Sequence, residues 1–272
     1  IRDRVTSMSS TAKDITKVSR RRAFSKADRT TLGAFVGIPL FFHLLLVWIP
    51  ALLTILLSFT YWSGISISRI KWAGLANYQN IFFDTPAFWE GLKNNVIWLG
   101  WFALIATPLG ILLAYQIDRQ IRGHKFYETA YYLPVVLSLA VTGIIWNFLL
   151  RPDGFVNGLF GRDIDNAISF FGNYDINIYV ILTIASWRHI GYIMLLYLAG
   201  LKSVDSALRE AASLDGATEW QTFKKVVFPS MKPVNIIVIV ITIIESLRAF
   251  DIVYIIYGSS AGFPILGTLV FQ

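Results

Sequence analysis

Charged side chains inside long apolar stretches are the groups in this sequence best suited to chemistry. Arg188 and His189 lie in the middle of one stretch, and Glu245, Arg248 and Asp251 follow at intervals of three residues in another. That interval places both carboxylates on the arginine's side of a helix. If the stretches cross a membrane, a central charge costs about 2.5–3.5 kcal/mol on insertion scales, so these groups should face a cavity or a partner.

Two roles are open for these charged groups. Glu245, Arg248 and Asp251 either line a polar cavity or neutralise one another as a structural ion-pair cluster. Arg188 has no counter-ion nearby in the sequence, so a cavity-facing position and a structural one are equally open for it.

The residue patterns that metal binding, ATP hydrolysis and nucleophilic catalysis require are not found in the sequence. The sequence has no cysteine, and His43, His124 and His189 have no metal-ligand spacing. No Gly-x-x-x-x-Gly-Lys-[Ser/Thr] phosphate loop occurs, so the chain should not bind and split ATP by itself. A Ser-His-Asp arrangement and a Gly-x-Ser-x-Gly elbow are not evident either. We therefore expect no catalytic residue, no metal site and no cofactor bound by this chain.

The apolar residues occur in blocks long enough to cross a membrane. Of the 272 residues, 55% are apolar and 15% are charged, against about 25% charged in soluble domains. Segments 30–68, 94–117 and 129–150 contain no Asp, Glu, Lys or Arg, and each exceeds the roughly 20 residues that span the hydrocarbon core. The pattern predicts an all-α, polytopic transmembrane helical bundle. The five expected spans are at about residues 32–59, 94–117, 129–150, 178–201 and 234–256.

The basic residues give the orientation. Nine of the 24 Lys and Arg residues lie within the first 29 positions, which predicts a basic cytoplasmic tail over residues 1–31 under the positive-inside rule. Loops 118–128 and 202–233 are then cytoplasmic too, and both carry several cations. Residues 32–272 form the transmembrane domain. Topology thus accounts for the net charge of +7, and we expect no nucleic-acid partner.

The expected topology leaves the end of the sequence outside the membrane. The last apolar run, 263–271, is too short to span. Because an even number of spans would return the chain to the cytoplasm, we expect a sixth span that is truncated in this sequence. The start at Ile1 also indicates a fragment.

Segment 203–233 is a polar interruption between two apolar stretches, with clear signals for helix ends. A first helix is predicted over 205–214, followed by Gly216, which can take the left-handed conformation that closes a helix. Thr218 opens a second helix, with Gln221 as its capping-box partner. That helix should end before Pro229, because proline disfavours helical geometry in the preceding residue. These signals predict one fixed shape at the membrane surface, suited to docking.

The motifs of this segment resemble a known family. Glu210-Ala211-Ala212, Asp215-Gly216-Ala217, Phe223 and Pro229 are similar, in type and spacing, to the cytoplasmic signature loop of permeases in binding-protein-dependent ABC importers. The resemblance implies the ABC importer permease fold, and it implies that the two short helices dock in a groove of an ATP-hydrolysing subunit. We therefore call residues 203–233 the coupling segment. The alternative is a generic cytoplasmic helical hairpin.

The resemblance extends over most of the chain and favours the carbohydrate-uptake type, similar to the larger maltose permease subunit. One departure lies near the end, where many relatives have Gly-Gly-Pro and this chain has Gly258-Ser259-Ser260-Ala261-Gly262-Phe263-Pro264. The further matching motifs are Asn77-Tyr78, Phe88-Trp89, Asn95, Leu133-Pro134, Trp146, Gly154, Asn157, Trp187, Gly191-Tyr192, Ala199-Gly200-Leu201, Phe250-Asp251 and Tyr254.

Residue types suggest how the coupling segment would meet a partner. The small alanines allow close approach, and Glu210 offers a charge-assisted hydrogen bond. Asp215 should fix the bend through its side chain, and Trp220 is a natural interface anchor. For Phe223, contact with the partner and packing on the membrane helices are equally open. The expected ATPase-coupling residues are Glu210, Ala211, Ala212, Asp215, Gly216, Ala217, Trp220, Phe223 and Pro229.

A sugar pathway needs flat aromatic surfaces beside hydrogen-bonding groups, because sugar rings present apolar C–H faces. Aromatic and polar residues inside the spans offer that combination, although the aromatic belts at membrane interfaces compete as an explanation. The expected substrate-pathway residues are Trp146, Asn147, Trp187, Arg188, Tyr192, Glu245, Arg248 and Asp251.

The resemblance implies a multi-pass subunit of the prokaryotic plasma (inner) membrane that forms half of the translocation pathway for a sugar or sugar-like solute. Its implied partners are a second homologous permease subunit, two copies of an ABC ATPase subunit, an extracytoplasmic solute-binding protein and the lipid bilayer. ATP and magnesium would be used by the ATPase and not by this chain.

Two other function classes predict different features. A membrane-embedded enzyme acting on lipid-linked sugar would need an exposed acid or base at an interface, whereas Glu245, Arg248 and Asp251 form a largely compensated trio. An ion-driven secondary transporter predicts inverted repeats and helices broken at the midplane, and neither is evident in the sequence. We keep the enzyme as the alternative.

Overall fold

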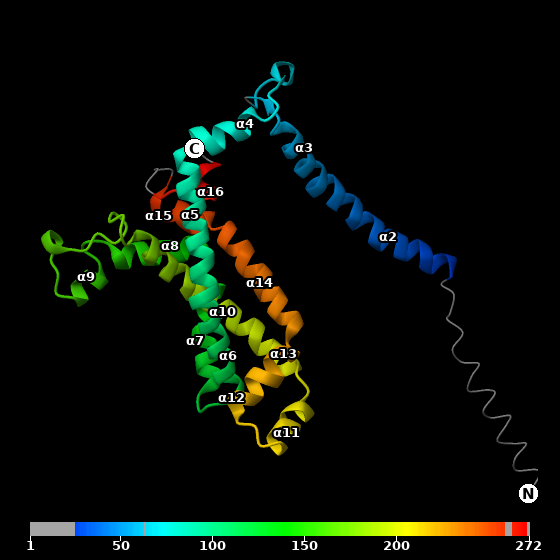
Figure 1. Cartoon of the computed structure of the whole chain (residues 1–272), viewed down its shortest axis with the longest axis vertical. Coiled ribbons are helices and arrows are strands. Elements are labelled where there is room, and N and C mark those ends of the chain that lie inside the picture. The colour runs from blue at the N-terminus through cyan, green and yellow to red at the C-terminus, as the bar shows by residue number, and fades with distance from the viewer. Residues whose placement is uncertain (1–24, 63, 259–262, 271–272) are drawn as a thin grey trace, which may run out of the picture. The chain divides into compact units, whose positions relative to one another are not determined.

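The computed structural model describes residues 25–62, 64–258 and 263–270 and is mainly helical (Figure 1). Most of the expected basic tail and part of the departing segment, residues 259–262, lie outside the described residues. The chain divides into two compact units, Ile1–Gln79 and Asn80–Gln272. The expected boundary between residues 31 and 32 stays a prediction.

The first unit is built around one long helix. Ser25 caps its start, in a capping box with Asp28. The helix is apolar over most of its length, and its large apolar side chains are exposed, so they need an apolar environment to cover them. Its parts are α2 (Lys26–His43), η1 (Leu44–Trp48) and α3 (Ile49–Leu57), followed by β1 (Thr60–Tyr61), η2 (Ile67–Arg69), β2 (Lys71–Trp72) and α4 (Ala76–Gln79).

An asparagine closes the connection that follows this helix. Strands β1 and β2 pair antiparallel, with Thr60 opposite Trp72. The Asn77 side chain donates hydrogen bonds to the carbonyls of Ser58 and Thr60, at 2.9 and 3.0 Å. The Asn77-Tyr78 motif therefore holds the end of the helix to the start of the sheet.

The second unit is organised around α10 (Asn177–Ser203), which packs along α6 (Thr107–Asp118). Gly110 permits this approach, because a Cβ at that position would lie 2.8 Å from the Ile193 side chain. One buried apolar cluster includes Trp98 and Ile181, and a second includes Ala114, Ile193 and Phe223. Helix α6 continues the run formed by α5 (Pro86–Trp101) and η4 (Phe102–Ala106), and η3 (Asn80–Asp84) precedes this run.

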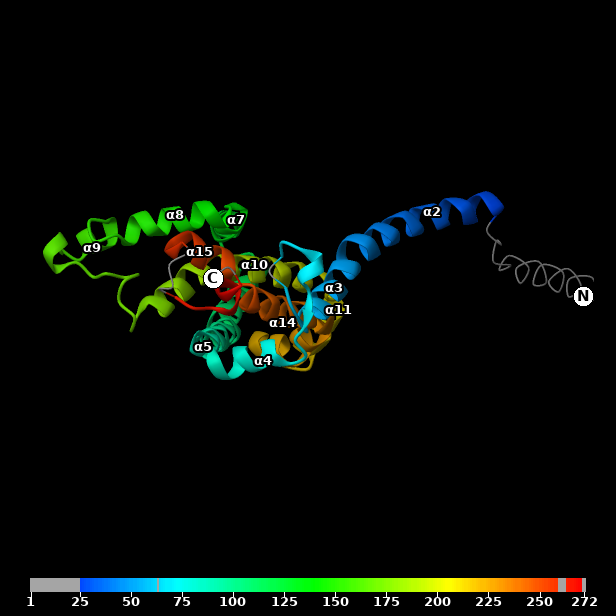
Figure 2. The same cartoon turned by 90° about the horizontal axis from the view of Figure 1, so that it is seen from above.

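The expected span at 129–150 is not one continuous helix, because two helices form this region, and whether they make one span stays a prediction. α7 (His124–Val136) and α8 (Leu139–Leu150) meet at a bend of 100°. Leu137 and Ser138 are extended there, and the Ser138 side chain caps α8 by accepting from Val141 N at 3.2 Å. Figures 1 and 2 show α8 and α9 (Phe155–Leu159) leading away from α7. The short helix η5 (Ile164–Asn166) follows.

The expected span at 234–256 is broken as well. α14 (Lys232–Leu247) ends at Arg248, and α15 (Phe250–Tyr257) starts after Ala249. These two linking residues have ψ angles of 20° and 33°, outside helical geometry. α16 (Leu266–Leu269) is the last described helix.

Within the described residues, three helical runs are long and apolar enough to cross a membrane. They are Ala27–Leu57, Pro86–Asp118 and Asn177–Ser203, and the bent pair of α7 with α8 and α9 would count as a fourth. They cover most of the first, second and fourth expected spans. The total of five spans stays a prediction.

Three prolines inside helices each follow a widened turn. The π-helical turns η1, η4 and η6 (Phe223–Val227) end two residues before Pro50, Pro108 and Pro229. In each, the residue before the proline donates its backbone N–H to the carbonyl five residues earlier. Proline lacks an N–H and crowds the carbonyl four residues before it. The wider turn accommodates both effects without ending the helix.

The expectation that the second helix of the coupling segment ends before Pro229 was therefore wrong. α12 (Glu219–Thr222), η6 and α13 (Phe228–Ser230) continue through that residue. Phe228, which precedes the proline, keeps helical angles of φ −61° and ψ −43°. The widened turn at η6 overrides the local preference of a residue before proline.

Candidate functional site

The first helix of the coupling segment closes as the sequence predicts. α11 (Ser206–Leu214) is followed by Gly216 with φ +80°. The N–H groups of Gly216 and Ala217 donate to the carbonyls of Ser213 and Ala212, at 3.1 and 3.0 Å. This pair of bonds is a Schellman closure. It fixes the bend through the backbone, so the expected role of the Asp215 side chain was wrong: that side chain is exposed and makes no such bond in the described structure.

Both helix starts in the segment are capped. The Asp205 side chain accepts from Ala207 N at 2.9 Å. Thr218 and Gln221 form the predicted capping box, in which Gln221 N donates to Thr218 Oγ1 at 3.3 Å and Thr218 N donates to Gln221 Oε1 at 2.8 Å. The shape of the segment is thus fixed by bonds between residues close in sequence.

The expected coupling residues divide between two faces. Ala212 and Phe223 are buried, at 8% and 6% exposure, and Ala217 is half-buried. On the outer face, Trp220 is 57% exposed, and Leu214, which was not among the expected residues, is 90% exposed. The other outer residues among those expected are Glu210, Ala211, Asp215, Gly216 and Pro229.

Phe223 packs within the chain, which answers the question that the sequence left open. Its ring lies 4.7 Å from the Tyr115 ring of α6, centroid to centroid, and 6.0 Å from the Phe228 ring. It also stacks on Trp220, at 5.4 Å. Phe223 therefore anchors the segment to a membrane helix, and Trp220 covers it while keeping an exposed surface.

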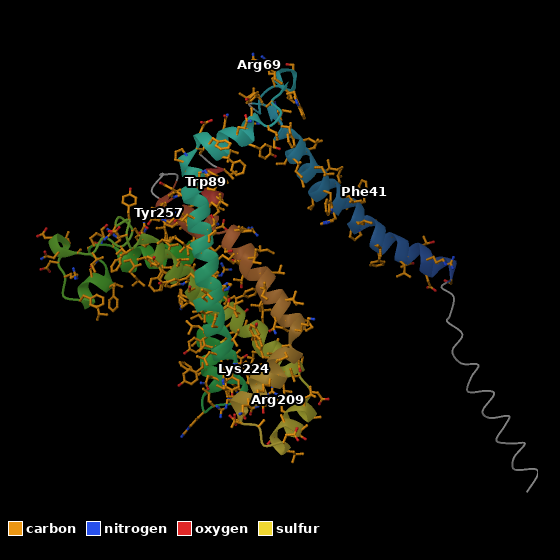
Figure 3. The ribbon with its side chains drawn as sticks, viewed as in Figure 1. Phe41, Arg69, Trp89, Arg209, Lys224 and Tyr257 are labelled. Atoms are coloured by element: carbon orange, nitrogen blue, oxygen red, sulfur yellow. The ribbon has the colours of Figure 1, made fainter. Side chains whose placement is uncertain are left out.

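Two ion pairs that the sequence did not predict join the segment to the end of α6. Arg209 Nη1 lies 2.7 Å from Asp118 Oδ2, and Arg119 pairs with Glu219. The only sequence signal was the opposite charges of two cytoplasmic loops. Figure 3 shows Arg209 and Lys224 at one end of the second unit and Trp89 and Tyr257 toward the other.

A cavity of about 500 Å³ lies among the helices of the second unit. Its volume is within the roughly 300–1,000 Å³ typical of small-molecule sites. Five of the expected pathway residues line it together, from α10 and from the region where α14 breaks before α15. They are Arg188, Tyr192, Glu245, Arg248 and Asp251.

The expected ion-pair geometry of the trio is not present. Within the described residues, Arg248 forms no ion pair with Glu245 or Asp251. The helix break at Arg248–Ala249 interrupts the regular three-residue spacing on which the prediction depended. All three side chains are exposed and line the cavity instead. Of the two alternatives that the sequence left open, their positions agree with the lining of a polar cavity.

The remaining pathway residues lie elsewhere. Trp146 and Trp187 pack edge to face, with ring centroids 5.7 Å apart, and Trp146 contacts the buried apolar cluster around Ile181. Asn147 is half-buried next to Trp146. None of these three residues lines the 500 Å³ cavity, so the predicted pathway is brought together only in part.

The structure adds Trp98 and Phe102, which line the cavity and were not in the expected set. His189, which was expected to face a cavity or a partner, also lines the cavity, and its ring stacks on Phe102 with centroids 4.1 Å apart. His189 Nε2 lies 3.4 Å from Thr107 Oγ1. Apolar aromatic residues in apolar helices carry no sequence signal that would separate cavity lining from core packing. Within the described residues, no group of three or more His, Asp or Glu could hold a metal ion.

Comparison with known proteins gives consistent matches. Residues 106–272 match the family described as binding-protein-dependent transport system inner membrane component. The chain is 32% identical over 234 residues to a probable ABC transporter permease protein of Pyrococcus horikoshii, covering 85% of this chain and 78% of that protein. It is also 32% identical over 221 residues to the probable starch degradation products permease protein AmyD of Thermoanaerobacterium thermosulfurigenes, covering 80% and 73%.

Two solved structures share the fold. One is a bacterial ABC transporter involved in the import of the acidic polysaccharide alginate, with a TM-score of 0.74 and 22% identity over 90% of this chain and 84% of that one. The second is a bacterial alginate transporter in complex with a periplasmic protein bound to an alginate pentasaccharide, with a TM-score of 0.73 and 22% identity over 92% and 85%. These matches give no support to the membrane-enzyme alternative. The chain belongs to the inner-membrane permease components of binding-protein-dependent ABC transporters, in which ATP hydrolysis resides in a separate subunit.

Proposed function

We propose that this permease couples to an ATPase through residues 203–233 and forms half of the translocation pathway for a sugar or sugar-like solute. The observation that carries the coupling role is the exposed surface of α11, of its closing bend and of α12. Glu210, Leu214 and Trp220 are exposed there on a segment whose conformation is fixed by its own caps. A rigid, exposed, partly apolar surface loses little entropy on docking, which favours affinity.

The proposed assembly contains four kinds of partner. A second homologous permease completes the pathway, two ATPase copies dock on the coupling segments, an extracytoplasmic binding protein delivers the solute, and lipid surrounds the bundle. The N-terminus and the coupling segment lie in the cytoplasm, as the distribution of Lys and Arg favours. ATP and magnesium are used by the ATPases and not by this chain.

The cavity supports the pathway part of the proposal. It combines aromatic surface at Trp98 and Tyr192 with hydrogen-bonding side chains at Arg188 and Glu245, and hydroxyl-rich ligands need both kinds of contact. Named relatives transport starch degradation products, xylose or arabinose, and sn-glycerol 3-phosphate. This range favours a sugar or sugar derivative as cargo here.

The energy for transport comes from the partner. ATP-driven closure of the ATPases would draw the coupling segments together and switch the helix bundle from inward-facing to outward-facing. The cavity would then open alternately to each side of the membrane. In this mechanism the permease converts partner motion into access, without a chemical step of its own.

Copurification with the ATPase tests the coupling role. We expect Glu210→Lys and Gly216→Pro to lose the ATPase and transport, because one reverses an exposed charge and the other places proline at a φ of +80°, which its ring forbids. Asp163→Lys is the matched control, since it reverses an exposed carboxylate in the connection between α9 and α10. Retained ATPase in both coupling variants would disprove the assignment, provided that the variants elute as folded protein.

A further inference from the structure

Arg209 holds the ends of two membrane helices from its position on the coupling segment. Its Nη1 lies 2.7 Å from Asp118 Oδ2, at the last residue of α6. Its Nη2 donates to the Leu201 carbonyl at 2.9 Å, close to the end of α10. One side chain of α11 is thus bonded to both helices that form the main contact of the second unit.

The electrostatics of the helix ends favour a cation at this position. The last four carbonyls of a helix lack partners within the helix, and Leu201 is among them in α10. A carboxylate at a helix C-terminus, such as Asp118, is unfavourable without a nearby cation. The planar guanidinium offers two donors at once. The Asp118 side chain is only 13% exposed and that of Arg209 is 36% exposed, so solvent weakens this pair less than it weakens fully exposed pairs.

Apolar contacts hold α11 only lightly. Ala212 is its one buried residue. A second cavity, of about 240 Å³, separates parts of the segment from α6, with Asp118, Arg119, Arg209 and Glu219 among its lining residues. The Arg119–Glu219 pair is more exposed, at 47% and 69%, and contributes less. Polar bonds at Arg209 therefore provide a large part of the connection between α11 and the bundle.

The connection between α10 and α11 allows α11 to tilt if the bonds of Arg209 are lost. Val204 and Asp205, which form this connection, have extended ψ angles of 130° and 128°. At the other end of α11, the closure at Gly216 joins the helix firmly to the rest of the coupling segment. A displacement applied to α11 reaches α6 and α10 only if something stiffens the connection at Val204 and Asp205.

We propose that Arg209 is a positioning residue that makes α11 and the cytoplasmic ends of α6 and α10 move as one body. The proposal rests on the coupling role of residues 203–233. It adds that partner motion enters the membrane through the Asp118–Arg209–Leu201 contacts, so that their loss leaves the partner attached while the membrane helices no longer follow it.

Distance measurements in the assembled transporter test this link. The chain has no cysteine, so spin labels can be placed at Ser206→Cys on α11 and Gln116→Cys on α6, both exposed. The complex with its ATPase is measured in lipid vesicles, without nucleotide and with ATP and vanadate. With Arg209 intact, we expect one narrow distance distribution that is the same in both states. In Arg209→Ala it should broaden about two-fold and shift with nucleotide, since the tether is lost.

Three controls separate the outcomes. Arg122→Ala removes an exposed cation of the connection between α6 and α7, which has no ion pair in the described structure, and should leave the distribution unchanged. The double variant Asp118→Arg with Arg209→Asp restores the charge pair with its signs exchanged. It should reverse at least about half of the broadening of the distance distribution that Arg209→Ala causes. ATPase copurification should persist in Arg209→Ala, in contrast to Glu210→Lys.

Each remaining result would overturn the proposal. An unchanged distribution in Arg209→Ala means that packing alone holds α11. Loss of the ATPase in Arg209→Ala, with unchanged distances, makes Arg209 a docking residue. No recovery in the charge exchange removes the ion pair from the explanation. Retained ATPase in Glu210→Lys instead contradicts the proposed function, and the nucleotide-free distances still report the link.

Discussion

The coupling segment and the large cavity are built in opposite ways. The segment takes its shape from residues close in sequence, such as Thr218 with Gln221 and Gly216 with Ser213. The cavity is lined by residues up to 154 positions apart, from Trp98 to Ile252. A docking surface can be specified by local bonds, whereas a pathway between helices exists only when the whole bundle is packed.

Disturbing the helix packing should damage both regions and gives the largest expected effect. In Gly110→Val, a Cβ would lie 2.8 Å from Ile193 and 3.0 Å from the Ile190 carbonyl, and overpacking costs about 1–3 kcal/mol. We expect aggregation in detergent and loss of both transport and the ATPase. Gly100→Val is the control, because it lies in the same helical run with no atom within 4 Å of its Cβ. Equal behaviour of the two variants in size-exclusion chromatography would contradict the packing argument.

Changes confined to the cavity should lower transport without affecting ATPase binding by the coupling segment. Arg188→Ala and Glu245→Ala remove ionised groups that line the cavity without touching the coupling segment. We expect uptake of a radiolabelled sugar, one that the binding protein retains, to fall about ten-fold, equivalent to about 1.4 kcal/mol.

Copurification of the ATPase with these cavity variants should be unchanged. Arg162→Ala, an exposed arginine of the connection after α9, serves as the control for uptake. If the cavity variants lose the ATPase, the two regions are not separable and the comparison fails.

A change confined to the bend at Gly216 should weaken ATPase binding and leave the helix bundle intact. Its effect should be smaller than that of the cavity variants. Gly216→Ala puts a Cβ on a residue with φ +80°, at about 1–2 kcal/mol for left-handed geometry. No atom lies within 4 Å of that Cβ, so strain is the only penalty. We expect several-fold weaker ATPase binding with an unaltered melting temperature of the bundle.

Gly158→Ala, which also adds a Cβ in open space, should change neither quantity. A lower melting temperature in Gly216→Ala alone would show that the bend also supports the bundle, and the local account of the segment would then be wrong.

The smallest effect should come from the exposed cap of α12. Thr218→Ala removes the hydroxyl that accepts from Gln221 N, and loss of such a cap costs about 1 kcal/mol. Amide hydrogen exchange should become faster in residues 219–222 and stay the same in α11. Thr218→Ser keeps the hydroxyl and should restore slow exchange, whereas protection that is unaffected by either change would show that packing, not capping, holds α12.

Much of the coupling segment could be predicted because its signals act over four or five residues. Gly216 and Thr218 specify a bend and a cap wherever the chain places them. Pro229 shows the limit of this approach, since the widened turn at Phe223–Val227 absorbs the proline. The proline can be recognised in the sequence, whereas no sequence signal predicts the π-helical turn that accommodates it.

The cavity could be predicted only as a set of candidate residues. Glu245, Arg248 and Asp251 have helical spacing, which left an ion-pair cluster and a cavity lining both open, and the break after α14 places them as separate lining groups. Trp146 and Trp187 have the composition of a sugar-contact pair and pack on each other instead. Residue type does not determine which face of a helix meets a neighbour.

The sequence alone determined the helical membrane class and the local closure of residues 203–233, because apolar block length and capping act along the chain. The tertiary structure decided which charges meet, as at Arg209 and Asp118, and which residues share a cavity. Those outcomes depend on contacts between distant helices, where a glycine such as Gly110 sets how closely two helices approach. Such contacts between distant helices do not produce a periodic pattern that can be recognised in a single sequence.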